Sequence, residues 1–285
     1  MSNLVVFQMS CRKDFVKETK LMEDSIFPYI RRRGQNAFYP VNYRERLFEE
    51  NESYLKSARN VLLMIHGYRS IYENVERKYN LIQNLLAEKS GVEYDLIVEY
   101  YWPGSWEAAV GFVAAYNRAP ISAKYLSKGF LYFMFFLEKI MNLEIENVTV
   151  SAHSLGCFVS LGLFSCADLL PKSFFELNAF KNLNLVHASP AVNKNDFKEN
   201  TRSVDLLTEK LNKYLLFSTK KDNVLKFAYR TVPSNWFSPS IAFSPDSVPS
   251  ELKQKMQHID LTEEISGHGN YHKSETYLKF PQMLL

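Results

Sequence analysis

A single serine lies where a strand pattern changes into a helix pattern. The segment NVTVSAHSLGCFVSLGLF (147–164) begins with strand-forming residues, passes through Ser154 and continues as an amphipathic stretch. Ala152 and Gly156 stand two residues before and two residues after Ser154. A sharp strand-to-helix turn that holds a nucleophilic serine needs small side chains at these positions, because larger ones would collide with the strand and the helix. We therefore interpret Ser154 as the nucleophile of an acyl-transfer site.

A serine nucleophile needs a general base, and the base needs a carboxylate that orients it. When the serine lies on such a turn, the acid comes after it along the chain and the histidine comes last. Asp222 comes just after the apolar run KYLLFST (213–219), so we expect it to be the acid; Lys220 and Lys221 would favour its ionised form if they lie close. The alternative acids come less directly after an apolar run: Asp196, Asp205 and Asp246.

The base is expected after the last strand-like run, HIDLT (258–262). His268 lies there in a loop between Gly267 and Gly269, which leave its backbone free to aim the ring. His272 is the alternative, although it lies where the final helix begins, and His258 lies at the wrong end of the strand. The remaining histidines are interpreted as structural: His66, His153 and His187.

Backbone N–H groups must stabilise the oxyanion that forms during acyl transfer. One is expected from Leu155, directly after the serine. The other is expected from Tyr68, at the end of NVLLMIHGY (60–68), where Gly67 lets the backbone approach the substrate.

Short apolar runs alternate with longer helical patterns along the whole chain. This alternation predicts an α/β fold, with a mostly parallel central sheet and helices on both faces, in a single domain over residues 1–285. Ligands of such sheets bind beyond the carboxyl ends of the strands, where the candidate serine, acid and base would meet. The expected strands lie at 4–9, 60–68, 95–103, 147–152, 184–190, 213–219 and 258–262, and the expected helices at 72–89, 122–142 and 154–170.

The apolar residues of segment 122–142 recur at helical spacing, as Leu126, Phe130, Phe133 and Leu137 show. Core packing explains this spacing. Alternatively, the helical segment of about 104–145 forms part of a substrate pocket or cap. Together with the aromatic residues of 100–106, it favours a hydrophobic acyl substrate.

Composition excludes several classes of function. The net charge is +3, which is too weak to indicate a nucleic-acid partner. Neither GxGxxG nor a Walker loop is present, the three cysteines form no metal-ligand spacing, and the proposed chemistry needs neither cofactor nor metal. The longest apolar block, 130–137, is too short to span a bilayer, and the N-terminus has no basic signal-peptide region. We expect a soluble cytoplasmic protein.

Five blocks of the sequence, taken in order, resemble the bacterial α/β-hydrolase family DUF900. They are VLLMIHGY, EYYWPGS, VSAHSLG, LLFSTKKDNVL and IDLT with GHGNYH after it. The resemblance covers about residues 60–271 and implies a serine hydrolase fold with Ser154, Asp222 and His268 at its site. It implies little about the substrate. The chain departs from the expected pattern at Asn193 and Asn195, where an acidic residue would be expected nearer the strand.

Three functions are compatible with these residues. The first is hydrolysis of an ester, with a lipid or other hydrophobic acyl group as the favoured substrate. The second is a thioesterase or acyltransferase that uses the same three residues. The third is a non-catalytic interaction module with a hydrolase fold, because a fold alone does not determine function. The complete order of serine, acid and histidine favours an enzyme.

Overall fold

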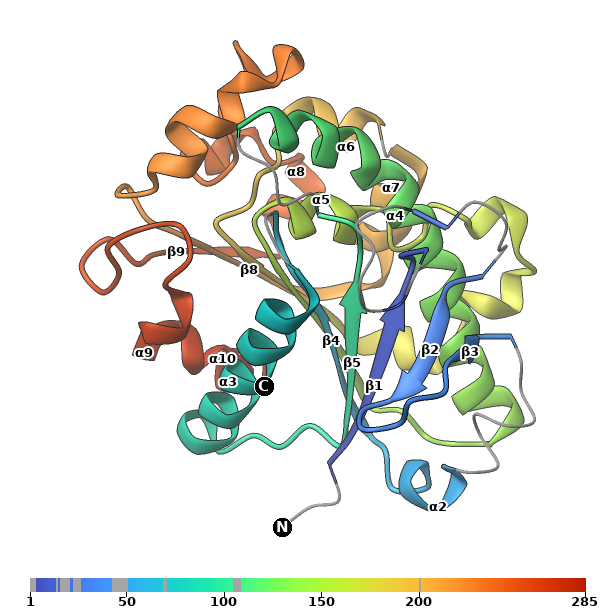
Figure 1. The fold of residues 1–285 in the computed structure, drawn as a ribbon. Coiled ribbons are helices and arrows are strands. Elements are labelled where there is room, and N and C mark those ends of the chain that lie inside the picture. The colour runs from blue at the N-terminus through green and yellow to red at the C-terminus, as the bar shows by residue number, and fades with distance from the viewer. Residues whose placement is uncertain are drawn as a thin grey trace.

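One sheet organises the molecule, as the computed structural model shows (Figure 1). The model describes residues 4–13, 15, 21–22, 27–42, 51–68, 71–104, 109–199 and 201–285. In these residues the sheet has nine strands, in the order β3-β2-β1-β5-β4-β6-β7-β8-β9. Their bounds are β1 Val5–Ser10, β2 Tyr29–Arg32, β3 Tyr39–Pro40, β4 Asn60–Ile65, β5 Leu96–Tyr101, β6 Asn147–His153, β7 Leu183–Ala188, β8 Leu211–Ser218 and β9 Met256–Asp260.

In the sheet order from β1 to β9, every pair of neighbouring strands is parallel. The antiparallel pairs are β1–β2 and β2–β3, at the other edge. The prediction of a mostly parallel sheet is thus confirmed. The edge strands β2 and β3 were not predicted, because neither has a long apolar run.

Both faces of the sheet are covered, which explains why its strands are apolar at successive positions. In β4, Val61 and Leu63 belong to one buried cluster, whereas Leu62 and Met64 belong to the other. The first cluster includes residues of α2 Glu52–Leu55, α4 Ala109–Phe135, α5 Leu155–Leu161, α6 Lys194–Glu199, α7 Thr201–Lys210 and α8 Ser250–Lys253. The second includes residues of α3 Tyr72–Ser90, α9 Glu275–Leu278 and α10 Phe280–Leu284.

Helix α3 packs on the face of β4 that carries Leu62 and Met64. Its Tyr79 hydroxyl donates to the Met64 carbonyl at 3.0 Å, near the edge at which parallel sheets bind their ligands. Its buried side chains recur at helical spacing and include Tyr72, Val75, Tyr79, Ile82 and Leu86. The helix ends at Gly91, whose φ of 62° lies in the left-handed region that glycine adopts without strain.

The apolar side chains of 122–142 pack in the core, as the first interpretation of their spacing predicts. Leu126, Phe130, Phe133 and Leu137 are fully buried in the cluster on the α4 side. Residues 105–108, which include Trp106, lie outside the described residues.

No helix in the described parts of the chain is both long enough and apolar enough to cross a membrane. The three cysteines are buried and unpaired.

Candidate active site

Ser154 lies between the end of β6 and the start of α5, in a backbone conformation that few residues adopt. Its φ is 55° and its ψ is −123°. Such angles cost free energy and persist only where the surroundings enforce them. Gly156, two residues after Ser154, has no side chain for a geometric reason. A Cβ atom on Gly156 would lie 2.8 Å from the Ile65 carbonyl oxygen and closer still to that of His66.

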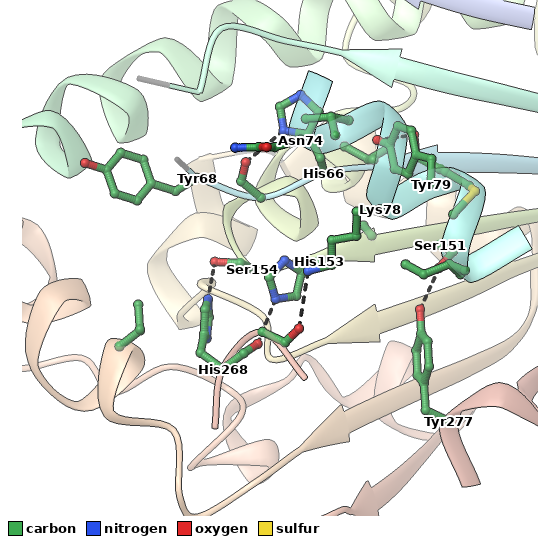
Figure 2. A pocket seen from close by; sticks show the side chains of 18 residues that line it. His66, Tyr68, Asn74, Lys78, Tyr79, Ser151, His153, Ser154, His268 and Tyr277 are labelled. Carbon is green, nitrogen blue, oxygen red and sulfur yellow. Dashed lines mark hydrogen bonds between the residues drawn. The ribbon is translucent and has the colours of Figure 1, made fainter. Parts of the chain in front are cut away.

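The three side chains that the sequence separates meet at this turn. Ser154 Oγ lies 2.7 Å from His268 Nε2 (Figure 2). His268 Nδ1 lies 2.7 Å from Asp222 Oδ2. Because a carboxylate only accepts, Nδ1 carries the proton and Nε2 is left to accept from the serine hydroxyl. That tautomer is the one a general base requires. The His268 side chain is 14% exposed, so a substrate can reach it, whereas Asp222 is fully buried.

Asp222 is held by the turn that comes after β8. Its second oxygen, Oδ1, accepts a hydrogen bond of 2.9 Å from the Leu225 N–H. Burial alone would raise the pKa of Asp222, but the hydrogen bond and charge of His268 and the Leu225 N–H hold the pKa below its ordinary value. The carboxylate is therefore ionised at neutral pH and can stabilise a protonated imidazole.

The alternative acids and bases lie elsewhere. Asp196 is buried and bonds to the Tyr116 hydroxyl and the Asn193 N–H, while Asp205 and Asp246 are exposed. His258 bonds to Ser218 Oγ at 2.8 Å on the last strand, and His272 is half-buried in the turn Tyr271–Lys273.

The loop after β4 lies directly against the serine turn. A Cβ atom on Gly67 would lie 2.8 Å from that of Ser154, so only glycine fits at this position. The next residue, Tyr68, packs its ring edge-on against Phe112, with centroids 5.2 Å apart. Leu155 begins α5, and the N–H at the first position of a helix has no partner within that helix. The predicted oxyanion donors Tyr68 and Leu155 thus belong to the two segments that meet at Ser154.

His66 braces this loop and does not contact Ser154. Its Nδ1–H donates to the Gly67 carbonyl at 2.8 Å, and its Nε2 accepts from the Trp102 N–H at 3.2 Å. Burial, helped by the charge of Arg12, lowers the pKa of His66 to about 3. The ring is therefore neutral and only a weak base near pH 7, and both of its nitrogens are engaged by the loop and Trp102.

His153 links the serine turn to the loop of the predicted base, a role that its position beside Ser154 did not reveal. Its Nε2–H donates to the His268 carbonyl oxygen at 2.9 Å. The two rings lie 4.9 Å apart. Burial and the charge of Lys78 lower the pKa of His153 well below its ordinary value, so its ring stays neutral.

A cavity of about 350 Å³ opens beside Ser154. Ser154, His153 and His268 line one side, and Lys78 and Asn74 of α3 line another (Figure 2). Most other lining residues are apolar or aromatic: Met64, Ile65, Tyr68, Val75, Tyr79, Ile82, Ala152, Val224 and Tyr277. None of the described residues of 109–145 lines this cavity. No three or more His, Cys, Asp or Glu side chains of the described residues are grouped so that they could hold a metal ion.

Lys78 is a polar lining residue that the sequence did not single out. The signal was its position on the helix: Asn74, Lys78 and Ile82 are four residues apart and share one face. A lysine in line with a buried isoleucine is unusual on an amphipathic helix.

A family model described as "Alpha/beta hydrolase of unknown function (DUF900)" matches residues 47–283. A comparison with curated proteins finds no match.

Solved structures are similar to the chain at low identity. A protein described as uncharacterized from Bacillus cereus ATCC 10987 is 14% identical with a TM-score of 0.47, and the match covers 80% of this chain and 58% of that one. Esterase PE8 is 14% identical with a TM-score of 0.45, over 81% of this chain and 95% of that one. Est1E from Butyrivibrio proteoclasticus, solved with ferulic acid, is 11% identical with a TM-score of 0.40, and the match covers 79% of this chain and 89% of that one. The match thus spans less than two thirds of the Bacillus protein's length.

Proposed function

The chain belongs to the alpha/beta hydrolase family DUF900, and from this premise we propose that it is a serine hydrolase that cleaves esters with Ser154, His268 and Asp222. One observation carries the proposal. On a strained turn, the serine hydroxyl, the imidazole and a buried carboxylate are joined by two hydrogen bonds of 2.7 Å. This order of groups is what nucleophilic acyl transfer requires.

The reaction proceeds in two halves. Ser154 Oγ attacks the ester carbonyl carbon while His268 Nε2 takes the hydroxyl proton, and Asp222 stabilises the imidazolium that forms. The N–H groups of Tyr68 and Leu155 stabilise the oxyanion. When this intermediate collapses, His268 returns the proton to the leaving alcohol and an acyl-enzyme remains. Water, deprotonated by His268, then attacks the acyl carbonyl and releases the acid and the free Ser154 hydroxyl.

A fluorophosphonate probe tests the nucleophile directly. We expect the wild type to be labelled and the Ser154→Ala variant not to be labelled. Ser266→Ala is the matched control, because Ser266 is exposed in the loop that carries His268 but lies on no strained turn; this variant should be labelled like the wild type. A folded wild type that the probe does not label would favour a non-catalytic binding module instead.

A panel of 4-nitrophenyl esters of increasing chain length then measures activity. Loss of Ser154 should lower kcat by roughly a millionfold if the serine acts as nucleophile. Adding a thiol or an alcohol to the reaction distinguishes hydrolysis from acyl transfer, since an acyltransferase would form the thioester or the new ester in preference to the free acid.

A further inference from the structure

We propose that Lys78, assisted by Asn74, binds an anionic group of the substrate, so that the ester cleaved at Ser154 carries a carboxylate or a phosphate. This inference rests on the proposed function, because it assigns a ligand to the cavity beside the same serine. It concerns the substrate class and not the reaction.

Lys78 points from α3 into the cavity, toward His153 (Figure 2). Its ammonium lies 3.4 Å from the carbonyl oxygen of Gly269, the residue directly after the predicted base. A ligand group bound to this ammonium would therefore lie beside the triad, within the same cavity as the ester.

The charge of Lys78 has no counter-ion in the described part of the chain. No described carboxylate lies within 4.0 Å of its ammonium, and Asp222 is already engaged by His268. Burial lowers the pKa of Lys78, which indicates that its charged form has lost part of its hydration. A cation that is partly desolvated and unpaired is unfavourable by itself, and an anionic ligand would compensate for that cost.

Asn74 supplies a second set of donors. It lies one helical turn before Lys78 and lines the same cavity. Its Oδ1 accepts a hydrogen bond of 2.9 Å from Arg77 Nη2, and none of the described residues accepts from its amide N–H groups. An ammonium and an amide N–H group one turn apart can both donate to a carboxylate or a phosphate.

The apolar walls define the rest of the ligand. Val75, Tyr79 and Ile82 lie on the same helix, and Met64 lies beneath them on β4. These residues suit a short hydrocarbon segment between the ester and the anionic group.

Esters of equal length and different charge test the proposal. The pair is 4-nitrophenyl hexanoate, which is neutral, and 4-nitrophenyl hydrogen adipate, which ends in a carboxylate. A 4-nitrophenyl hexanoate with a terminal phosphate ester distinguishes the two kinds of anion. The wild type should have a higher kcat/KM for at least one anionic ester than for the neutral ester.

The variants isolate the charge of Lys78. Lys78→Met should lower the ratio of kcat/KM for the preferred anionic ester to kcat/KM for hexanoate by about 10- to 100-fold, whatever it does to hexanoate cleavage itself. Lys78→Arg should retain most of the preference. Lys89→Met on the same helix is the control, since Lys89 is solvent-exposed and should affect neither ester. An equal ratio of anionic to neutral activity in wild type and Lys78→Met would overturn the proposal.

A binding measurement separates this inference from the proposed function. Calorimetry with hexyl phosphate and with hexanoate on the Ser154→Ala protein needs no catalysis. Binding that Lys78→Met abolishes supports the anion site even if no ester is cleaved. The opposite outcome is that the protein cleaves 4-nitrophenyl hexanoate while neither hexyl phosphate nor the hexanoate anion binds. In that case the hydrolase proposal stands and the anion site is rejected.

Discussion

At the scale of single residues, the role proposed for Asp222 is one that a neutral amide cannot fill. Its Oδ2 accepts from His268 and its Oδ1 accepts from the Leu225 N–H. In Asp222→Asn the amide can present an N–H to His268, which would favour the tautomer with the proton on Nε2. We expect kcat to fall by about 10⁴-fold, measured with a 4-nitrophenyl ester.

The fold should survive this change, because Asn has nearly the same shape. A circular dichroism spectrum equal to that of the wild type is the control. Activity within tenfold of the wild type would argue that Asp222 does not orient the base.

His153 should act through the position of His268 and not through substrate binding. Removing its hydrogen bond to the His268 carbonyl in His153→Leu frees the loop, and a neutral hydrogen bond contributes about 1 kcal/mol. We therefore expect kcat to fall up to about tenfold with KM unchanged. His153→Gln, which can still donate, should recover most of the loss; a rise in KM alone would contradict a positioning role.

At the scale of elements, the serine turn depends on how closely α5 approaches the end of β4. Gly156→Ala would place a Cβ atom against the carbonyl oxygens of Ile65 and His66, which are backbone atoms and cannot move aside cheaply. We expect the free energy of unfolding to fall by about 1–3 kcal/mol, measured by urea denaturation.

Gly269→Ala is the matched control for this change. No atom lies within 4 Å of a Cβ built at Gly269, so stability should change by less than about 0.5 kcal/mol. Equal stability of the two variants would show that the turn can relax around a methyl group.

Element patterns also explain which parts of the molecule could be predicted. The parallel strands are apolar at successive positions because both faces are buried, so the sequence predicted the sheet and the residues at its carboxyl edge. Ser154, Asp222 and His268 could be proposed because each comes after an apolar run. The role proposed for Lys78 could not be predicted from the sequence. Helical spacing shows on which face of α3 Lys78 lies, but not whether that face meets packed side chains or a cavity. Likewise, the spacing of 122–142 fits a core helix and a pocket wall equally well.

At the scale of the whole molecule, the two buried layers contain ionisable groups that must stay neutral in the folded state. His66 lies beneath the loop after β4, and His187 on β7 bonds to Ser160 Oγ and the Tyr214 hydroxyl. Burial lowers the pKa of each to about 3, against 6.5 for an ordinary histidine. His66 comes directly after β4 and His187 lies on β7, two strands further along the same sheet, so their titration affects the stability of the whole fold.

This burial predicts that the protein loses stability in mild acid. Between pH 6.5 and about 3 the unfolded chain binds a proton at each of these histidines and the folded chain does not, so a fall in pH favours unfolding. Each histidine should lower the free energy of unfolding by about 2 kcal/mol between pH 7 and pH 5. Urea denaturation at both pH values measures this difference, and in His187→Gln it should shrink by about 2 kcal/mol whatever the variant's stability at pH 7. An unchanged difference would mean that the folded protein binds a proton at His187 as readily as the unfolded chain does.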